Sequence, residues 1–416
     1  MDIEALVRDP DITRALRATR SHITRSGRVF SDVVDADGNQ YVDLVMEGGG
    51  MLGIALVGYT WTLEQLGIRF LGVGGTSAGS INALLLAGLD EPARPKSPKL
   101  LAELGSMDFF EFVDGGSDAR ALVEALARGA GKFSLGFHLL RNLDEINNEL
   151  GMNPGDTFTR WLRELLREAG VRTLADLQAR LQTRPGGLHV RPDAGHAERP
   201  LPSGRLALVA ADIATETKVL FPQMADMYFK TPDKVDPALF ARASMSIPFF
   251  FEPLILKGLP RDEAARERWH AVGYDTRTEK GGVPRRAVFV DGGIMSNFPI
   301  DVFHSPRSVP RMPTFGVKLQ YDDRAKRIDG PIALLLATFN SARHCLDYDF
   351  IRRNPDYQHL VERIPCQGYN WLNFAMTDEE KLGLFREGVV TACRFLREFD
   401  WQAYKAIRAD LARAVR

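Results

Sequence analysis

The residue best suited to chemistry in this sequence is Ser77, which stands in the pattern Gly75-x-Ser77-x-Gly79. A serine hydroxyl is a poor nucleophile unless it is held exposed and another group takes its proton. The apolar residues 68–73 before the pattern predict a strand, and the residues after it predict an apolar helix. The pattern alone is weakly specific, but a serine on such a strand-to-helix turn is held at the edge of a sheet beside a helix N-terminus. This context therefore indicates a nucleophile.

A second signal is the glycine-rich run Gly48–Gly53, which reads Gly48-Gly49-Gly50-Met51-Leu52-Gly53. Three consecutive glycines leave backbone N–H groups free to point at one place, as in an oxyanion hole, where each donor is worth about 3–4 kcal/mol. The same run fits the dinucleotide-binding pattern G-x-G-x-x-G. Nucleotide binding needs an acidic residue at the end of the next strand, but that strand ends in Gly-Gly-Thr-Ser. We favour the oxyanion hole and keep nucleotide binding as an alternative.

The third signal is Asp291, which ends a predicted strand over 287–290 and is followed by Gly292 and Gly293. An acid at the carboxyl end of a parallel strand lies at the same edge as Ser77 and could accept its proton, although Asp-Gly is also a common turn. A Ser-His-Asp triad is the alternative mechanism, and it needs a histidine later in the chain. The histidines in that part of the sequence are His304, His344 and His359, and none follows a clear strand.

The elements that must position these residues alternate between strand and helix. We expect strands over 41–46, 68–73, 206–211, 287–290 and, as the last of the sheet, 314–319. We expect helices over 53–66, from Ile81 to Leu86, through most of 92–180 with a break at 151–156, and over 377–399, where Thr377 and Glu380 predict a capping box. Strand, glycine turn and helix repeat twice near the start, which indicates an α/β fold with a parallel sheet.

The same pass along the chain predicts its organisation. We expect an N-terminal arm with a short helix over 1–40 and a catalytic core over 41–305. Charged or Pro- and Gly-rich segments near 185–202 and 258–286 predict loop insertions in that core. A mostly helical portion over 306–416 is expected to complete the same domain.

Composition limits the classes of function. The chain has 416 residues, 45% of them hydrophobic and 26% charged, with a formal net charge of -1, which gives no basic field for nucleic acid. Its cysteines, Cys345, Cys366 and Cys393, are odd in number and argue against a disulfide framework or zinc. The sequence shows neither a signal peptide nor a transmembrane segment. We expect a cytoplasmic protein whose contact with membranes is peripheral, with export by a signal-less route left open.

In this order, the three blocks resemble the patatin-like phospholipase family. Asn297 and Pro299 extend the resemblance, and weaker similarities at 211–215, 243–250 and 377–399 spread it over most of residues 41–400. The resemblance implies a three-layer α/β/α sandwich with a mostly parallel central sheet. It also implies hydrolysis of fatty-acyl esters of phospholipids or galactolipids, of phospholipase A type, without metal or cofactor.

The resemblance also implies roles for individual residues. Ser77 would be the nucleophile and Asp291 its base, in a Ser-Asp dyad that uses no histidine. The amides of Gly49, Gly50 and Met51, next to Gly48, would form the oxyanion hole. The residues that would support these motifs are Gly53, Gly75, Gly79, Gly292 and Gly293.

One departure and one aromatic cluster stand beside this resemblance. Leu52 occupies a position where the family usually has Arg or Lys. The loss of this cation bears on the rate of hydrolysis or on headgroup preference. It also leaves open a further alternative, an inactive relative that acts as a membrane- or partner-binding scaffold. Phe249, Phe250 and Phe251 follow Pro248. Consecutive residues cannot all face one way, so we expect at least two of them in the core and one as a candidate for lipid contact.

Overall fold

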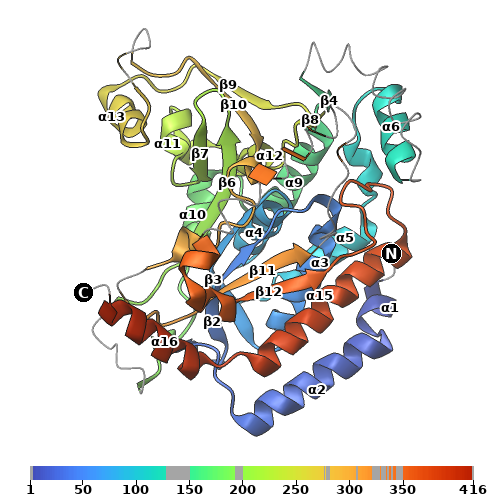
Figure 1. Ribbon diagram of the computed structural model, residues 1–416, viewed down its shortest axis with the longest axis vertical. Coiled ribbons are helices and arrows are strands. Elements are labelled where there is room, and N and C mark those ends of the chain that lie inside the picture. Colours follow the sequence, from blue (N-terminus) through green and yellow to red (C-terminus); the bar gives the residue numbers. More distant parts are fainter. Residues whose placement is uncertain are drawn as a thin grey trace.

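The computed structural model describes residues 3–127, 150–192, 200–275, 277, 282–305, 308–320 and 350–414, with isolated positions at 328, 334, 337–338 and 341–342. Its centre is a ten-stranded sheet with the principal order β12-β11-β2-β3-β6-β10-β9 (Figure 1). The strands of this sheet are β1 (Val33–Val34), β2 (Gln40–Met46), β3 (Ile68–Thr76), β5 (His189–Val190), β6 (Arg205–Asp212), β7 (Thr217–Phe221), β9 (Leu254–Lys257), β10 (Arg286–Asp291), β11 (Thr314–Gln320) and β12 (Val361–Pro365). A separate two-stranded sheet pairs β4 (Gly151–Asn153) with β8 (Phe249–Phe251).

Helices flank the sheet. The α-helices of the described residues are α1 (Ile3–Val7), α2 (Pro10–Ser26), α3 (Gly53–Gln65), α4 (Ala78–Gly88), α5 (Ser97–Ser106), α6 (Ser117–Ala127), α9 (Asp156–Glu168), α10 (Leu174–Gln182), α11 (Ala225–Tyr228), α12 (Ala238–Ser244), α13 (Glu263–Ala271), α15 (Asp378–Glu398) and α16 (Trp401–Ala414). Short 3₁₀ helices are η1 (Gly50–Leu52), η2 (Phe109–Phe112), η4 (Pro232–Lys234), η5 (Gly292–Ile294), η6 (Ile300–Phe303) and η7 (Pro355–His359).

The central strands β12, β11, β2, β3 and β6 run parallel to their neighbours, as the strand–helix alternation predicts. Beyond them the sheet is mixed, because β10 is antiparallel to both β6 and β9. The α/β fold with a mostly parallel centre is thus confirmed. The prediction that residues 314–319 form the last strand is wrong, since β12 follows and pairs with β11 at the edge. Its sequence, Val-Glu-Arg-Ile-Pro, is too polar to be recognised as a strand alone.

The two sides of β3 show how the layers are arranged. Successive strand residues point to opposite faces, so Gly74 and Gly75 face different layers. Gly74 faces Val302 and Phe303 of the η6 segment, whereas Gly75 packs directly against the backbone of Gly79 in α4. The residues of the sheet that carry the glycine motifs are therefore covered on both faces.

Helix α15 closes the core over α3, in which every residue except Gln65 is buried. Its capping box is confirmed, because the Thr377 side chain accepts from the Glu380 amide while Glu380 accepts from the Thr377 amide. Helix α2 lies alongside α15 (Figure 1), and the Arg386 guanidinium lies 2.6 Å from the Asp9 carboxylate. This 17-residue helix is longer than the short helix expected for the N-terminal arm.

Three segments differ in detail from the sequence expectations. The break at 151–156 begins with strand β4 rather than a simple loop, because Gly151 and Asn153 pair with β8. The insertion near 185–202 contains β5, which pairs with β1. The insertion near 258–286 contains α13, which is capped by the Asp262 side chain accepting from the Ala265 amide at 2.7 Å. Residues 193–199, 276 and 278–281 of these insertions lie outside the described part of the chain.

Candidate active site

Ser77 sits on the turn between β3 and α4 in a conformation that side chains rarely adopt. Its φ is 53° and its ψ is -121°, a region that is normally left to glycine. Its carbonyl accepts the first hydrogen bonds of α4 from Ser80 and Ile81, so the helix fixes the turn from one side. The residue is only 3% exposed, but its side chain lines a pocket. This is the geometry of a strained turn that presents a serine hydroxyl to a bound ligand.

The glycines around Ser77 are explained by close backbone packing. A Cβ added to Gly79 would overlap the carbonyl oxygen of Met46, at the end of β2. A Cβ added to Gly75 would lie 2.5 Å from the backbone of Gly79. Gly53 is restricted as well, because its Cβ would lie 2.9 Å from the Ala78 Cβ. Glycine at these positions lets α3, α4 and the two strands approach closely enough to form the turn.

Asp291 lies near Ser77, but the strand pairing that brings it there differs from the one predicted from the sequence. Strand β3 pairs with the first part of β6, where Thr76 lies opposite Val209. Strand β10 pairs with the remainder of β6, where Asp291 lies opposite Ala210. Because β7 pairs with residues 208–212 of β6 along one edge, β3 and β10 share the other edge and meet end to end. We call this point the strand junction, and it brings Ser77 and Asp291 together.

The expectation that β10 runs parallel to β3 is therefore corrected: β10 runs antiparallel to β6. It arrives from the opposite direction, and β6 extends three residues beyond β3 to receive it. Asp291 is 3% exposed, and its Oδ1 accepts a hydrogen bond of 2.7 Å from the Gly293 amide. Gly292 is needed here because an added Cβ would overlap the carbonyl oxygen of Val209.

A short segment at the end of α12 holds both residues of the strand junction. The Ser244 hydroxyl accepts from the Ser77 amide at 2.9 Å and donates to the Val209 carbonyl at 2.5 Å. Two residues later, the Ser246 carbonyl accepts from the Asp291 amide at 2.7 Å. In the sequence alone this block is only a weak similarity to the family, and it predicts no role for Ser244. A serine in an apolar helix carries no local signal of such a contact.

The glycine run lies against the segment that follows Asp291. Gly48 and Asn297 exchange two hydrogen bonds: the Gly48 amide donates to the Asn297 carbonyl at 3.0 Å, and the Asn297 Nδ2 donates to the Gly48 carbonyl at 3.1 Å. The Thr76 hydroxyl donates to the Ser296 carbonyl at 2.8 Å. These bonds join the three sequence blocks into one site. The order of the blocks in the chain does not by itself predict these contacts.

The amides of the glycine run are not equivalent. The Gly48 amide is used as described, and the Met51 amide donates to the Trp371 carbonyl at 3.0 Å. Among the described residues, no acceptor takes the amides of Gly49 and Gly50. The Ala78 amide, which begins α4, likewise has no acceptor in the described part of the chain, and it is a further donor that the glycine pattern does not predict. Of the four positions expected to form an oxyanion hole, Gly49 and Gly50 thus keep donors available.

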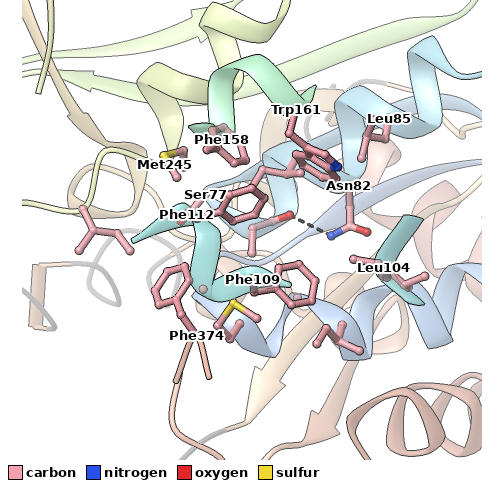
Figure 2. Close-up of a pocket in the computed structure, with 18 of the residues that line it drawn as sticks. Ser77, Asn82, Leu85, Leu104, Phe109, Phe112, Phe158, Trp161, Met245 and Phe374 are labelled. Carbon is pink, nitrogen blue, oxygen red and sulfur yellow. Dashed lines mark hydrogen bonds between the residues drawn. The ribbon is translucent and has the colours of Figure 1, made fainter. Parts of the chain in front are cut away.

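An apolar pocket opens beside Ser77 (Figure 2). Its lining is almost entirely apolar and comes from helices α3, α4, α5 and α9, the η1 and η2 segments, strand β8, and the loops before β8 and α15. The lining residues that the site uses directly are Gly50, Met51, Ser77 and Ala78, while Phe109, Phe112, Phe158 and Phe374 supply aromatic walls. Such a pocket suits a long hydrocarbon chain whose polar end lies at Ser77.

Histidines are placed elsewhere in the described structure. The His304 ring contacts the Tyr357 hydroxyl at 2.6 Å through Nδ1, and burial lowers the pKa of His304. His359 belongs to η7, and His344 lies outside the described residues. The lining of the pocket includes neither His304 nor His359. Over the described ranges, no group of three or more His, Cys, Asp or Glu side chains is arranged to hold a metal ion.

The sequence model of the patatin-like phospholipase family matches residues 44–304, which include the glycine run, the serine turn and Asp291. The chain belongs to this family. The family places it among the lipid acyl hydrolases. Its central sheet and flanking helices are those of a patatin-like fold.

Two curated proteins are similar in sequence. The protein YqhO of Bacillus subtilis (strain 168) is 30% identical over 366 residues, covering 87% of this chain and all of YqhO. An RpoH suppressor of Rhizobium meliloti (strain 1021) is 32% identical over 126 residues, which cover 23% of this chain and 19% of that protein.

Two solved structures are also similar. VipD from Legionella pneumophila has a TM-score of 0.41 at 14% identity, covering 89% of this chain and 70% of VipD. ExoU from Pseudomonas aeruginosa, solved in complex with SpcU, has a TM-score of 0.35 at 15% identity, covering 86% of this chain and 52% of that chain.

Leu52, where the patatin-like family usually has a cation, is fully buried in the core. Lys318 of β11 lies near the start of the glycine run, where its Nζ is 3.1 Å from the Glu47 carboxylate. The other Glu47 oxygen accepts from the Leu319 amide at 2.7 Å. Glu47 immediately precedes Gly48, so this buried pair anchors the start of the glycine run to β11.

Proposed function

We propose that the protein hydrolyses fatty-acyl ester bonds of phospholipids or related lipids through a Ser77–Asp291 dyad and an acyl-enzyme intermediate. The observation that carries the proposal is the strand junction, where the two residues meet beside an apolar pocket. The strained Ser77 conformation and the available amides of Gly49, Gly50 and Ala78 support the same mechanism.

In the first half of the reaction, Asp291 takes the proton of the Ser77 hydroxyl while the serine oxygen bonds to the ester carbonyl carbon. The carbonyl oxygen becomes an oxyanion, which the Gly49 and Gly50 amides and the N-terminus of α4 stabilise. The tetrahedral intermediate collapses when the bond to the leaving alcohol breaks and Asp291 returns its proton to that oxygen. The acyl group is then esterified to Ser77.

In the second half, Asp291 takes a proton from water, and the resulting oxygen attacks the acyl carbonyl carbon. The bond to Ser77 breaks, the serine oxygen recovers the proton from Asp291, and the fatty acid leaves. The Gly293 amide donates to one Asp291 oxygen throughout and orients the carboxylate. The aspartate is thus returned to its ionised form after each turnover.

The sharpest test uses Ser77→Ala and Asp291→Asn in the full chain. Both variants should release fatty acid from phosphatidylcholine vesicles more than about a thousandfold more slowly than the wild type. A fluorophosphonate probe should label the wild type and not Ser77→Ala. Asp301→Asn, at an exposed carboxylate of η6, is the matched control and should keep the wild-type rate. Unchanged hydrolysis by a folded Ser77→Ala protein would overturn the proposal.

The pocket also favours lipid esters over nucleotide binding, the other function of the glycine run considered above. The lining beside Gly50 and Met51 is apolar, and β3 ends in Gly-Gly-Thr without the carboxylate that would hold a ribose. We therefore propose no nucleotide ligand.

We propose that the enzyme meets its lipid at a membrane surface through the tip of the β4–β8 sheet. Phe249 is 43% exposed and pairs with Gly151, next to Leu150, which is 52% exposed. Phe250 and Phe251 are buried, and Phe251 lines the pocket, so the exposed tip is continuous with the acyl site. None of the described helices is long and apolar enough to cross a bilayer.

Vesicle sedimentation tests this contact. Phe249→Ser should reduce binding to phosphatidylcholine vesicles several-fold, because it removes an apolar group that would enter the lipid. Val390→Ser, at an exposed apolar position of α15, is the matched control and should bind as the wild type does. Equal binding by both variants would exclude this surface.

A further inference from the structure

The apolar pocket contains two polar atoms that the proposed mechanism does not use. Within the described structure, Asn82 Oδ1 and Trp161 Nε1 are buried and have no hydrogen-bond partner. Both residues line the pocket, and Figure 2 shows them among the side chains that surround it. A buried polar group without a partner is costly, so a pocket that only accommodated plain hydrocarbon would be expected to lack them.

The orientation of the Asn82 amide is set by its helix. Its Nδ2 donates to the Ala78 carbonyl at 3.0 Å. A carbonyl oxygen can only accept, so the amide nitrogen must face it, and Oδ1 must face away from that bond. Asn82 is 6% exposed, so solvent does not satisfy this oxygen. The pocket therefore presents one fixed acceptor.

The second atom is a donor from the facing helix. Trp161 lies on α9 and packs against Phe112 and Phe158, with ring centroids 5.4 Å and 5.9 Å away. Its indole nitrogen can only donate. The aromatic contacts hold the ring, so the donor is as fixed as the acceptor on α4.

Asn82 lies beyond the nucleophile rather than beside it. Asn82 comes five residues after Ser77 on the same helix, which places it about 7.5 Å further along the helix axis. Ile81 and Leu85 line the pocket on the same face of α4. An acyl chain with its carbonyl at Ser77 would run along this face and pass Asn82 well beyond its third carbon.

We propose that the acyl site is built for chains that carry a hydroxyl group part-way along their length. A hydroxyl donates one hydrogen bond and accepts others, so a single group can donate to Asn82 Oδ1 and accept from Trp161 Nε1. A plain chain leaves both atoms unpartnered, and a keto group satisfies only the indole. This inference rests on the proposed ester hydrolysis and names its substrate class as hydroxylated acyl esters.

The test compares p-nitrophenyl esters of stearic acid with isomers hydroxylated at carbon 3, 6, 9 or 12. The wild type should show a kcat/KM about tenfold higher, or more, for one isomer with the hydroxyl beyond carbon 3 than for the plain ester. The quantity compared is this ratio for each protein, so a general loss of rate does not affect it. A ratio near one at every position would overturn the inference.

Substitutions then locate the preference. Asn82→Leu and Trp161→Phe should each bring the ratio close to one, and circular dichroism checks that both variants fold. Tyr59→Phe is the matched control, because the Tyr59 hydroxyl is also buried without a partner among the described residues but lies outside the pocket lining. It should keep the wild-type ratio. A preference that survives both pocket substitutions would refute the assignment of these atoms.

A binding measurement separates this inference from the proposed function. Ser77→Ala protein, which cannot turn over esters, is titrated with the free hydroxy fatty acids and with stearic acid against a fluorescent fatty acid. Tighter binding of one hydroxylated isomer, lost in the Ser77→Ala Asn82→Leu double variant, supports the site whether or not the wild type hydrolyses esters. Equal affinities would reject the site, even if Ser77-dependent hydrolysis of the plain ester were observed.

Discussion

Two substitutions at Ser77 remove the same hydroxyl but differ in what they do to the backbone. Ser77 has a φ of 53° and a ψ of -121°, which a residue with a Cβ adopts only at a cost of about 1–3 kcal/mol. Ser77→Ala keeps the Cβ and therefore keeps this strain. Ser77→Gly removes it, but glycine gives the unfolded chain more freedom, which costs about 0.5–1 kcal/mol. We expect Ser77→Gly to be more stable than Ser77→Ala by about 1 kcal/mol.

Urea denaturation of the two variants measures this difference directly. The slopes of the two curves should be equal, so that the shift in midpoint reports the free energy of unfolding alone. Neither variant should hydrolyse esters. Their shared inactivity shows that the gain in stability comes from the backbone and not from a rebuilt site.

Ser80 provides the control, because it lies on α4 in an ordinary helical conformation three residues later. There the order should reverse, and Ser80→Gly should be less stable than Ser80→Ala by about 1 kcal/mol. If Ser77→Ala proves as stable as Ser77→Gly, or more stable, the argument that the turn stores strain for function is refuted.

Three further predictions follow from packing and burial. Ser244→Ala should lower kcat at least tenfold with a smaller change in KM, because the Ser77 amide loses its acceptor. Ser246→Ala is the control: it keeps the backbone contact to the Asp291 amide and should change activity little. Gly79→Ala should destabilise the protein by more than about 3 kcal/mol in denaturation curves, while Gly186→Ala, where an added Cβ meets nothing within 4 Å, should be tolerated. Burial lowers the pKa of Lys96 to about 8, so the folded protein releases this proton at a lower pH than the unfolded chain. Its free energy of unfolding should therefore rise by about 2 kcal/mol between pH 8 and 9.5, and Lys96→Met should abolish that rise.

The parts of the site that sequence predicts are those with local causes. The turn at Ser77 follows from an apolar strand, small residues and an apolar helix within about twenty positions. The capping box of α15 follows from two residues three positions apart. In both places the geometry is set by neighbours along the chain, so the pattern of residue types is sufficient.

The parts that sequence does not predict depend on distant partners. The Met51 amide is taken by the Trp371 carbonyl, and the Ser77 amide by Ser244, in contacts that no spacing rule relates. The approach of Asp291 is a more instructive case. Its proximity to Ser77 was expected from parallel strands, yet it arises because an antiparallel strand shares an edge of β6 with β3. A correct pairing of residues can thus follow from an incorrect topology.

Several exceptions to the usual rules of backbone conformation and hydrogen bonding occur together at the pocket beside Ser77. Their occurrence at one site is more informative than any single exception. A buried polar atom without a partner is not by itself a functional signal, since the described structure has others, such as the Tyr59 hydroxyl on α3. At the pocket, however, a non-glycine residue with positive φ, a glycine amide without an acceptor, and an amide oxygen and an indole nitrogen without partners occur together. Each would be removed at little cost if only stability were selected, because Gly at 77 or an apolar residue at 82 satisfies the fold as well. A bound ester with a polar group along its chain accounts for all three exceptions, whereas core packing accounts for none of them.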